Sequence, residues 1–151
     1  MLGRLGRSTD ALAEWNRALQ IAEPDDRLTI RQGRAFDLAR AGQYEQVQKE
    51  VADLLRELGS QVKGEQRYDL ACVLALTAKA VAQRSDLPLP RRESLANQLA
   101  RQAVDQLERA NAAPHHFFKK STHREYLHQD EDLRYLRDRE DYREFLRQLP
   151  P

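Results

Sequence analysis

Residues 26–58 read DRLTIRQGRAFDLARAGQYEQVQKEVADLLREL, and this stretch contains two amphipathic helices separated by a tight turn. In the second helix, expected over residues 44–58, apolar residues recur every three or four positions, as on one face of an α-helix. The first helix is expected over residues 26–41, and Gly42 ends it because glycine readily adopts the conformation found after a helix C-terminus. Since only Gly42 and Gln43 connect the two helices, they are predicted to form an antiparallel hairpin.

Further helices are predicted on both sides of this hairpin. Before it, a helix is expected over residues 9–22, with Ser8 or Thr9 as its N-terminal cap and a glycine turn at Gly6. After it, residues 65–83 are apolar almost all round the helix, which is typical of a buried helix. The remaining predicted helices cover residues 91–112, 130–136 and 140–149. The segment between residues 115 and 128 has no clear periodicity. Every predicted element is helical, so the expected fold class is all-α.

Composition excludes several classes of protein. The chain has 151 residues and a mass of 17.5 kDa, close to the size of one domain. Its 25 Lys and Arg residues nearly balance 24 Asp and Glu residues, which argues against a nucleic-acid partner. Cys72 is the single cysteine, so a disulfide scaffold is excluded. No apolar run approaches the ~18 residues of a membrane span, and the first residues do not resemble a signal peptide. We therefore expect a cytoplasmic location and no membrane insertion.

The hairpin has a counterpart earlier in the chain. Residues 6–12 (GRSTDAL) align with residues 42–48 (GQYEQVQ), 36 positions later, and in both a glycine precedes a helix. The chain resembles the tetratricopeptide (TPR) repeat family, whose helix pairs recur about every 34 residues. The resemblance implies antiparallel helix hairpins stacked as a right-handed solenoid with a short helical C-terminal cap. The resemblance implies two parts: a repeat region over residues 1–113 and a capping tail over residues 114–151. The repeat region would contain a half repeat (1–24) and two full repeats (26–58 and 65–112).

The C-terminal half carries a second resemblance. The segments YDLACV (residues 68–73), DEDLRYLR (130–137) and DYREF (141–145) occur in that order. This order is similar to the C-terminal tail of planctomycete-type bacterial TPR proteins that often follow a serine/threonine kinase domain. Asp69 stands where those tails commonly have asparagine. The sequence contains no kinase glycine-rich loop, His-Arg-Asp loop or Asp-Phe-Gly motif. The alternative function is therefore a structural C-terminal cap or a regulatory module of a larger kinase–TPR protein.

The candidate binding residues lie on the first helix of each predicted pair. In TPR proteins these helices line a concave surface that holds a peptide or a partner helix. The resemblance assigns Gln32, Phe36 and Arg40 to this surface, and their i, i+4, i+8 spacing places them on one helix face. Glu65 and Tyr68 are their equivalents in the next unit. We expect a non-catalytic protein-interaction domain, and the competing interpretation is that these side chains only coat the array.

Leu12 and Trp15 form a candidate association surface. Both lie on the apolar stripe of the first predicted helix, which lacks the upstream helix of a complete pair. An exposed apolar stripe favours contact with more protein. The expected partner is either the upstream repeats of a longer chain or a second copy, which would give a homodimer through the first helix.

No residue pattern points to a catalytic site, a metal or a cofactor, and the chain is not expected to be an enzyme. The histidines are His115, His116, His123 and His128, and their spacing fits no standard zinc framework. Phe117 and Phe118 are predicted to anchor the tail on the two preceding helices. Cys72 lies in the most apolar helix, which favours a buried core residue over a nucleophile. The acidic residues 130–132 are typical of a helix N-terminus.

Overall fold

The computed structural model describes residues 2–151, and side chains from residue 10 onward. The elements are α1 (Leu2–Ile21), α2 (Pro24–Arg40), α3 (Tyr44–Leu58), η1 (Gly59–Gln61), α4 (Gly64–Ala82), α5 (Leu89–Asn111), η2 (Phe117–Lys119), α6 (Ser121–Gln129), η3 (Glu131–Leu136) and α7 (Glu140–Arg147), where η denotes a 3₁₀ helix. No strand occurs within residues 2–151. The predicted all-α fold class is confirmed.

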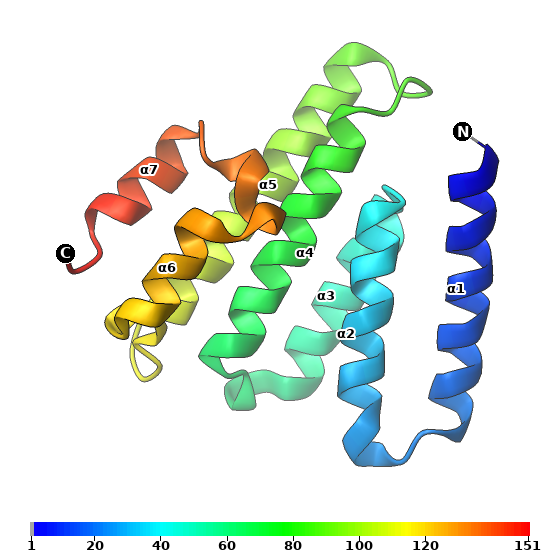
Figure 1. Ribbon diagram of the computed structural model, residues 1–151, viewed down its shortest axis with the longest axis horizontal. Coiled ribbons are helices and arrows are strands. Elements are labelled where there is room, and N and C mark those ends of the chain that lie inside the picture. Colours follow the sequence, from blue (N-terminus) through cyan, green and yellow to red (C-terminus); the bar gives the residue numbers. More distant parts are fainter. Residues whose placement is uncertain (1) are drawn as a thin grey trace.

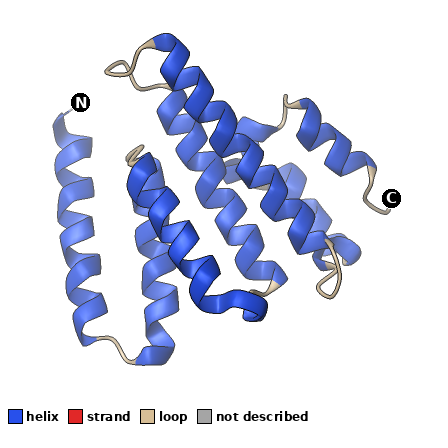
Figure 2. Cartoon of the chain, turned by 180° about the vertical axis from the view of Figure 1, so that it is seen from behind, coloured by secondary structure: helices blue, strands red, loops and turns tan. Residues whose placement is uncertain are grey.

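Two helix hairpins form the body of the molecule. α2 pairs with α3 and α4 pairs with α5, while α2 also packs against α4 (Figure 1). α1 packs on α2 at one edge, and the tail elements η2, η3 and α7 pack on α4 and α5 at the other edge. Seen from the opposite side, α3 and α5 lie in front (Figure 2). The chain therefore forms two helical layers, with α2 and α4 in one and α3 and α5 in the other.

The α2–α3 hairpin has the geometry that its sequence predicts. α3 occupies residues 44–58, as predicted, and the turn before it contains Gly42 with a φ angle of +71°. This left-handed conformation is strained for residues with a Cβ atom, so glycine suits the position. The hairpin thus follows from local sequence signals.

A buried carboxylate joins the two helices of this hairpin. Glu50 of α3 accepts hydrogen bonds from Arg31 and Arg34 of α2, with N–O distances of 2.6 Å for both. Arg34 also donates to Asn16 Oδ1 of α1 at 2.9 Å. Only 9% of the Glu50 side chain is exposed, so both ion pairs lie largely out of water. The Glu50 cluster, defined as Glu50, Arg31 and Arg34, therefore connects three successive helices.

α1 is longer than its sequence predicts. It begins at Leu2 rather than at residue 9, so the predicted turn at Gly6 and the predicted cap at Ser8 or Thr9 are wrong. All three residues lie within the helix. A single glycine inside a helix costs only about 1 kcal/mol relative to alanine, and no proline interrupts residues 2–21. The helix can therefore continue through a position that resembles a turn.

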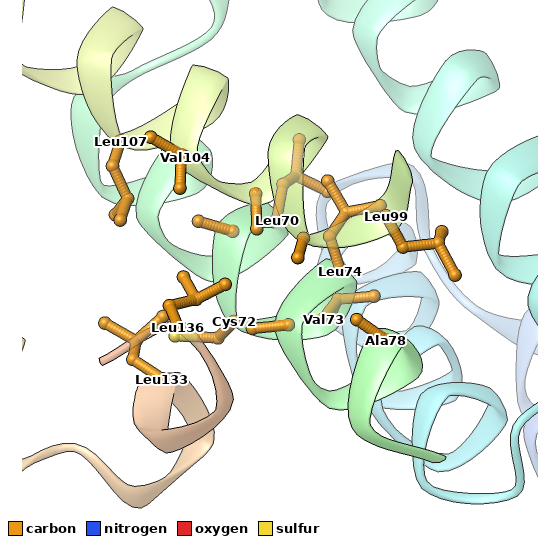
Figure 3. Close-up of a cluster of buried hydrophobic side chains, with 14 of the residues drawn as sticks. Leu70, Cys72, Val73, Leu74, Ala78, Leu99, Val104, Leu107, Leu133 and Leu136 are labelled. Carbon is orange, nitrogen blue, oxygen red and sulfur yellow. The ribbon is translucent and has the colours of Figure 1, made fainter. Parts of the chain in front are cut away.

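The core is centred on α4. Its side chains are buried on most of its circumference, as the apolar pattern predicted. Figure 3 shows them meeting α5 and η3 in one cluster. The labelled members are Leu70, Cys72, Val73, Leu74, Ala78, Leu99, Val104, Leu107, Leu133 and Leu136, each no more than 3% exposed. Among the helices of residues 2–151, none is long and apolar enough to cross a bilayer.

The C-terminal tail, defined as residues 114–151, is more structured than its sequence indicates. α6 occupies residues 121–129, a segment for which no helix was predicted. The predicted helix at 130–136 is a 3₁₀ helix over residues 131–136, and the last helix ends at Arg147 rather than at residue 149. Phe118 is fully buried and Phe117 is half-buried, and their rings lie 6.2 Å and 5.8 Å from that of Tyr68 of α4. Since η2 also packs on α5, both residues anchor the tail on the two preceding helices, as predicted.

Candidate functional site

The predicted binding residues of α2 share one face, as their spacing requires. Gln32 and Phe36 are half-buried and Arg40 is exposed. The Arg40 guanidinium lies 5.6 Å from the centre of the Phe36 ring, which is within the range of a cation–π contact. Phe36 also packs against the core through its inner side. Arg40 Nη1 also lies 3.5 Å from Asp37 Oδ1, so this face carries an aromatic ring and a positive charge that is paired with one carboxylate of the same helix.

The two predicted residues of α4 differ in their surroundings. Glu65 is exposed. Tyr68 is buried, with its ring 5.8 Å from Phe117 and 6.2 Å from Phe118. Because these aromatic residues belong to the tail, Tyr68 lies beneath it and does not face an open groove. The α2–α4 face, defined as Gln32, Phe36, Arg40 and Glu65, is the part of the predicted surface that the tail leaves accessible.

Asp130 holds the tail on α4. One of its carboxylate oxygens accepts a hydrogen bond from the backbone N–H of Asp132, at 2.9 Å, and so caps η3. Its other oxygen accepts the Tyr68 hydroxyl at 2.6 Å and lies 3.7 Å from Cys72 Sγ. The prediction that the acidic run begins a helix is confirmed. Sequence reasoning missed the second contact, because Tyr68 lies 62 positions earlier in the chain.

The same place holds the one His, Cys, Asp and Glu cluster with metal-ligand proximity in the described part of the chain. Ligand atoms of Cys72, Asp130 and Asp132 lie within 4.8 Å of one another. Burial, and then the negative charges of Asp130 and Asp132, raise the pKa of the Cys72 thiol. The thiol therefore stays protonated at neutral pH, which suits neither a nucleophile nor a thiolate ligand. The cluster is explained by the capping of η3 and the docking of the tail.

Acidic groups are crowded where α4 meets η3. Burial, and then the negative charges of Glu65 and Asp130, raise the pKa of Asp69 to about 6. Burial and the charge of Asp130 also raise the pKa of Asp132, while the positive charges of Arg40 and Lys79 oppose this. Like charges in a partly desolvated site repel each other, so this crowding costs stability at neutral pH.

An Asp69→Asn variant is expected to be more stable than the wild type at neutral pH. The folded chain binds the Asp69 proton more tightly than the unfolded chain does, because the pKa rises from 3.8 to about 6 on folding. The contribution of Asp69 to the free energy of unfolding is therefore present at low pH and is lost as the pH rises through about 6. Since Asp69 keeps some contact with water, we expect the variant to gain about 1 kcal/mol at about pH 7.5 and nothing at about pH 4.

Urea unfolding at the two pH values measures this difference. Asp138→Asn is the matched control, because the Asp138 side chain is fully exposed and its substitution should have little effect at either pH. An equal gain for Asp69→Asn at both pH values would contradict the electrostatic explanation and would point to packing or hydrogen bonding instead.

The predicted association surface is partly used within the chain. The Trp15 indole lies on α2, so close to Gly33 that a Cβ atom there would come within 2.6 Å of the ring. Its Nε1 donates a hydrogen bond to Asp37 Oδ2 at 2.7 Å. Leu12 and Trp15 are both half-buried, and Ile21 at the end of α1 is 85% exposed. The predicted homodimer or upstream repeat stays a prediction.

The histidines of the tail do not converge on a common site among the described residues. His123 stacks on Phe117, with ring centres 4.0 Å apart, and its Nδ1 lies 2.6 Å from the Phe117 carbonyl oxygen. His116 and His128 are exposed. His115 is half-buried, and a Cβ atom added at Gly64 would lie 3.2 Å from its Cβ atom. One histidine thus stacks on Phe117, one lies beside the start of α4 and two lie at the surface.

Comparison of the chain with family models, with curated proteins and with solved structures finds no match. The TPR and kinase-associated resemblances accordingly stay predictions.

Proposed function

We propose that this chain is a non-catalytic protein-interaction domain of the TPR type, which binds a peptide or partner helix on its α2–α4 face. The observation that carries the proposal is the half-buried Phe36 ring, with the Arg40 guanidinium 5.6 Å from its centre, on α2, which packs against α4. Aromatic residues, phenylalanine included, and arginine are enriched at the cores of protein interfaces.

The helix arrangement supports this proposal. α2 and α4 are the first helices of their respective hairpins, and they pack against each other (Figure 1). Adjacent first helices are the elements that line the binding surface of stacked helix-pair proteins. The proposed right-handed solenoid with a C-terminal cap is the simplest extension of this pairing to the whole chain.

The charges of this face indicate which peptide it would accept. Arg40 lies at the C-terminal end of α2 and Lys79 near the C-terminal end of α4, and both charges act on Asp132. Glu65 and Asp69 lie near the N-terminal end of α4. An extended peptide that places an acidic residue near Arg40 and a basic residue near Glu65 would complement both ends.

Selection of a displayed peptide library against the whole chain tests the proposal. Phe36→Ala and Arg40→Gln are each expected to weaken the selected peptides about tenfold in Kd, because each removes a contact with the bound peptide. Arg91→Gln is the matched control, since Arg91 is an exposed arginine of α5, away from this face. Selected peptides that bind both variants as tightly as the wild type would contradict the assignment.

A structural cap is the second candidate function, and the burial of the tail favours it. The tail contributes apolar side chains that are at most 2% exposed, and it covers the α4–α5 hairpin at the edge opposite α1 (Figure 1). They are Phe118, Leu127, Leu133, Leu136, Tyr142 and Phe145. Hydrogen exchange with the selected peptides separates the two functions, because a cap that binds nothing gives no added protection near Phe36. The kinase-linked role predicts that adding this chain in trans to a kinase domain of the same polypeptide changes the activity of that kinase.

A further inference from the structure

Figure 2 shows α3 and α5 at the front of the molecule. A groove of about 530 Å³ lies between these two helices, with α3 as one wall, α5 as the other and α4 between them. α3 lines it with Gln48, Val51, Ala52 and Leu55, and α5 lines it with Gln102, Asp105, Gln106 and Arg109. On both helices these residues follow the i, i+3, i+4, i+7 spacing, so each wall is one continuous helix face about two turns long.

The two walls differ in polarity. The α3 wall carries Val51, half-buried Leu55 and exposed Ala52, and Leu74 of α4 adds a buried apolar side chain. The α5 wall is polar, with two glutamine amides and one charge of each sign. A ligand that fills the groove must therefore be apolar on one side and polar on the other, as an amphipathic helix is.

Arg67 indicates which charge a ligand of this groove should carry. It reaches the groove from α4 and is half-buried, and its Nη1 donates a hydrogen bond to Gln106 Oε1 at 3.0 Å. Arg67 forms no ion pair with a carboxylate in residues 10–151, whereas Arg31, also half-buried, pairs with Glu50 and Glu57. Asp105 already forms an ion pair with Arg109, with 2.8 Å between its Oδ2 and the arginine Nε. The Arg67 guanidinium is thus removed from much of its water without receiving a carboxylate in return.

The local electrostatics point in the same direction. Burial, and then the positive charge of Arg109, lower the pKa of Arg67, and Asp105 opposes this only in part. Two guanidinium groups against one carboxylate leave the groove with an excess positive charge. A carboxylate placed there would meet a partly desolvated guanidinium, which is where charge-assisted hydrogen bonds are strongest.

We infer that the groove between α3 and α5 docks a short amphipathic helix of another protein, whose acidic side chain pairs with Arg67. Its apolar face packs on Val51, Leu55 and Leu74, and its polar face meets the glutamines of α5. This surface is separate from the α2–α4 face, and the inference does not depend on the proposed function.

A displayed library of helix-forming peptides of about 12 residues, selected against the whole chain, is the probe. We expect groove-binding peptides with a recurrent Asp or Glu at one register position, and amide signals of Gln48, Ala52 and Gln102 that shift on binding. Replacing that acid by its amide in the peptide should weaken binding about tenfold or more, the effect of a lost charged hydrogen bond.

Arg67→Gln is the matched change in the protein. It should weaken the acidic peptide about tenfold and should abolish the difference between the acid and amide peptides. Ala52→Lys places a long side chain at an exposed position of the groove and should block binding, while Arg91→Gln and Phe36→Ala should leave it unchanged. Thermal unfolding of each variant confirms that it is folded.

Three results would overturn the inference. They are selected peptides that bind outside the groove, groove binders without an enriched acid, and full affinity for Arg67→Gln. Because Phe36→Ala is predicted to act only on the α2–α4 face, failure of one proposal is distinguishable from failure of the other.

Discussion

The Phe118→Ala variant is expected to lose about 3–5 kcal/mol of its free energy of unfolding. Phe118 is fully buried, and its ring packs edge-on against Phe117 at 5.1 Å and Phe145 at 5.6 Å. It therefore joins η2 to α7 over the α4–α5 hairpin. Truncation removes apolar burial and leaves a cavity among rigid rings that cannot collapse around it. Urea unfolding followed by circular dichroism measures the loss.

Tyr126→Ala is the control for this experiment. Tyr126 belongs to the same tail but is 46% exposed, so its truncation should cost less than about 1 kcal/mol. If Phe118→Ala and Tyr126→Ala were equally stable, the tail would not be part of the cooperative fold. Amide hydrogen exchange in α6 and α7 would then be fast in the wild type as well.

The Glu50→Gln variant is expected to lose about 3 kcal/mol, because it removes the one carboxylate shared by two half-buried arginines. Arg31 and Arg34 would then face a neutral amide while remaining largely out of water. The loss of stability should extend to α1, because Arg34 also donates a hydrogen bond to Asn16 of that helix. Hydrogen exchange of α1 amides, together with urea unfolding, measures both effects.

Glu57→Gln is the matched comparison, because it removes the second carboxylate that pairs with Arg31. Glu57 also pairs with Arg31, but its side chain is 56% exposed. An exposed ion pair contributes at most about 1 kcal/mol, so the cost should be small. Similar losses for the two variants would mean that burial does not set the strength of the Glu50 cluster.

Local periodicity determined much of the helical structure from the sequence. The bounds of α3 agree with its apolar pattern, and the nearly continuous apolar surface of residues 65–83 predicted that α4 is buried. These elements are predictable because each rests on contacts three or four residues apart, which any sequence displays directly. The same reasoning placed Gln32, Phe36 and Arg40 on one face of α2.

Local patterns failed where tertiary contacts outweigh them. α6 has a single buried residue, Leu127, so its nine residues carry almost no apolar stripe. It forms within a tail that is held in place by Phe118 and Asp130. α1 continues through Gly6 because the cost of one glycine is small, although a glycine before a possible cap is also the usual sign of a turn.

The candidate sites show the same division. The sequence by itself determined that the chain is helical, that Cys72 is a core residue, that Phe118 anchors the tail, and which α2 side chains share a face. Only the tertiary structure decided that Tyr68 lies beneath the tail and donates a hydrogen bond to Asp130. It also decided that Arg67 lies in a groove between α3 and α5 and pairs there with Gln106 rather than with a carboxylate of residues 10–151. Helical periodicity fixes which side chains point the same way, whereas burial and charge pairing depend on residues tens of positions apart that meet only after folding.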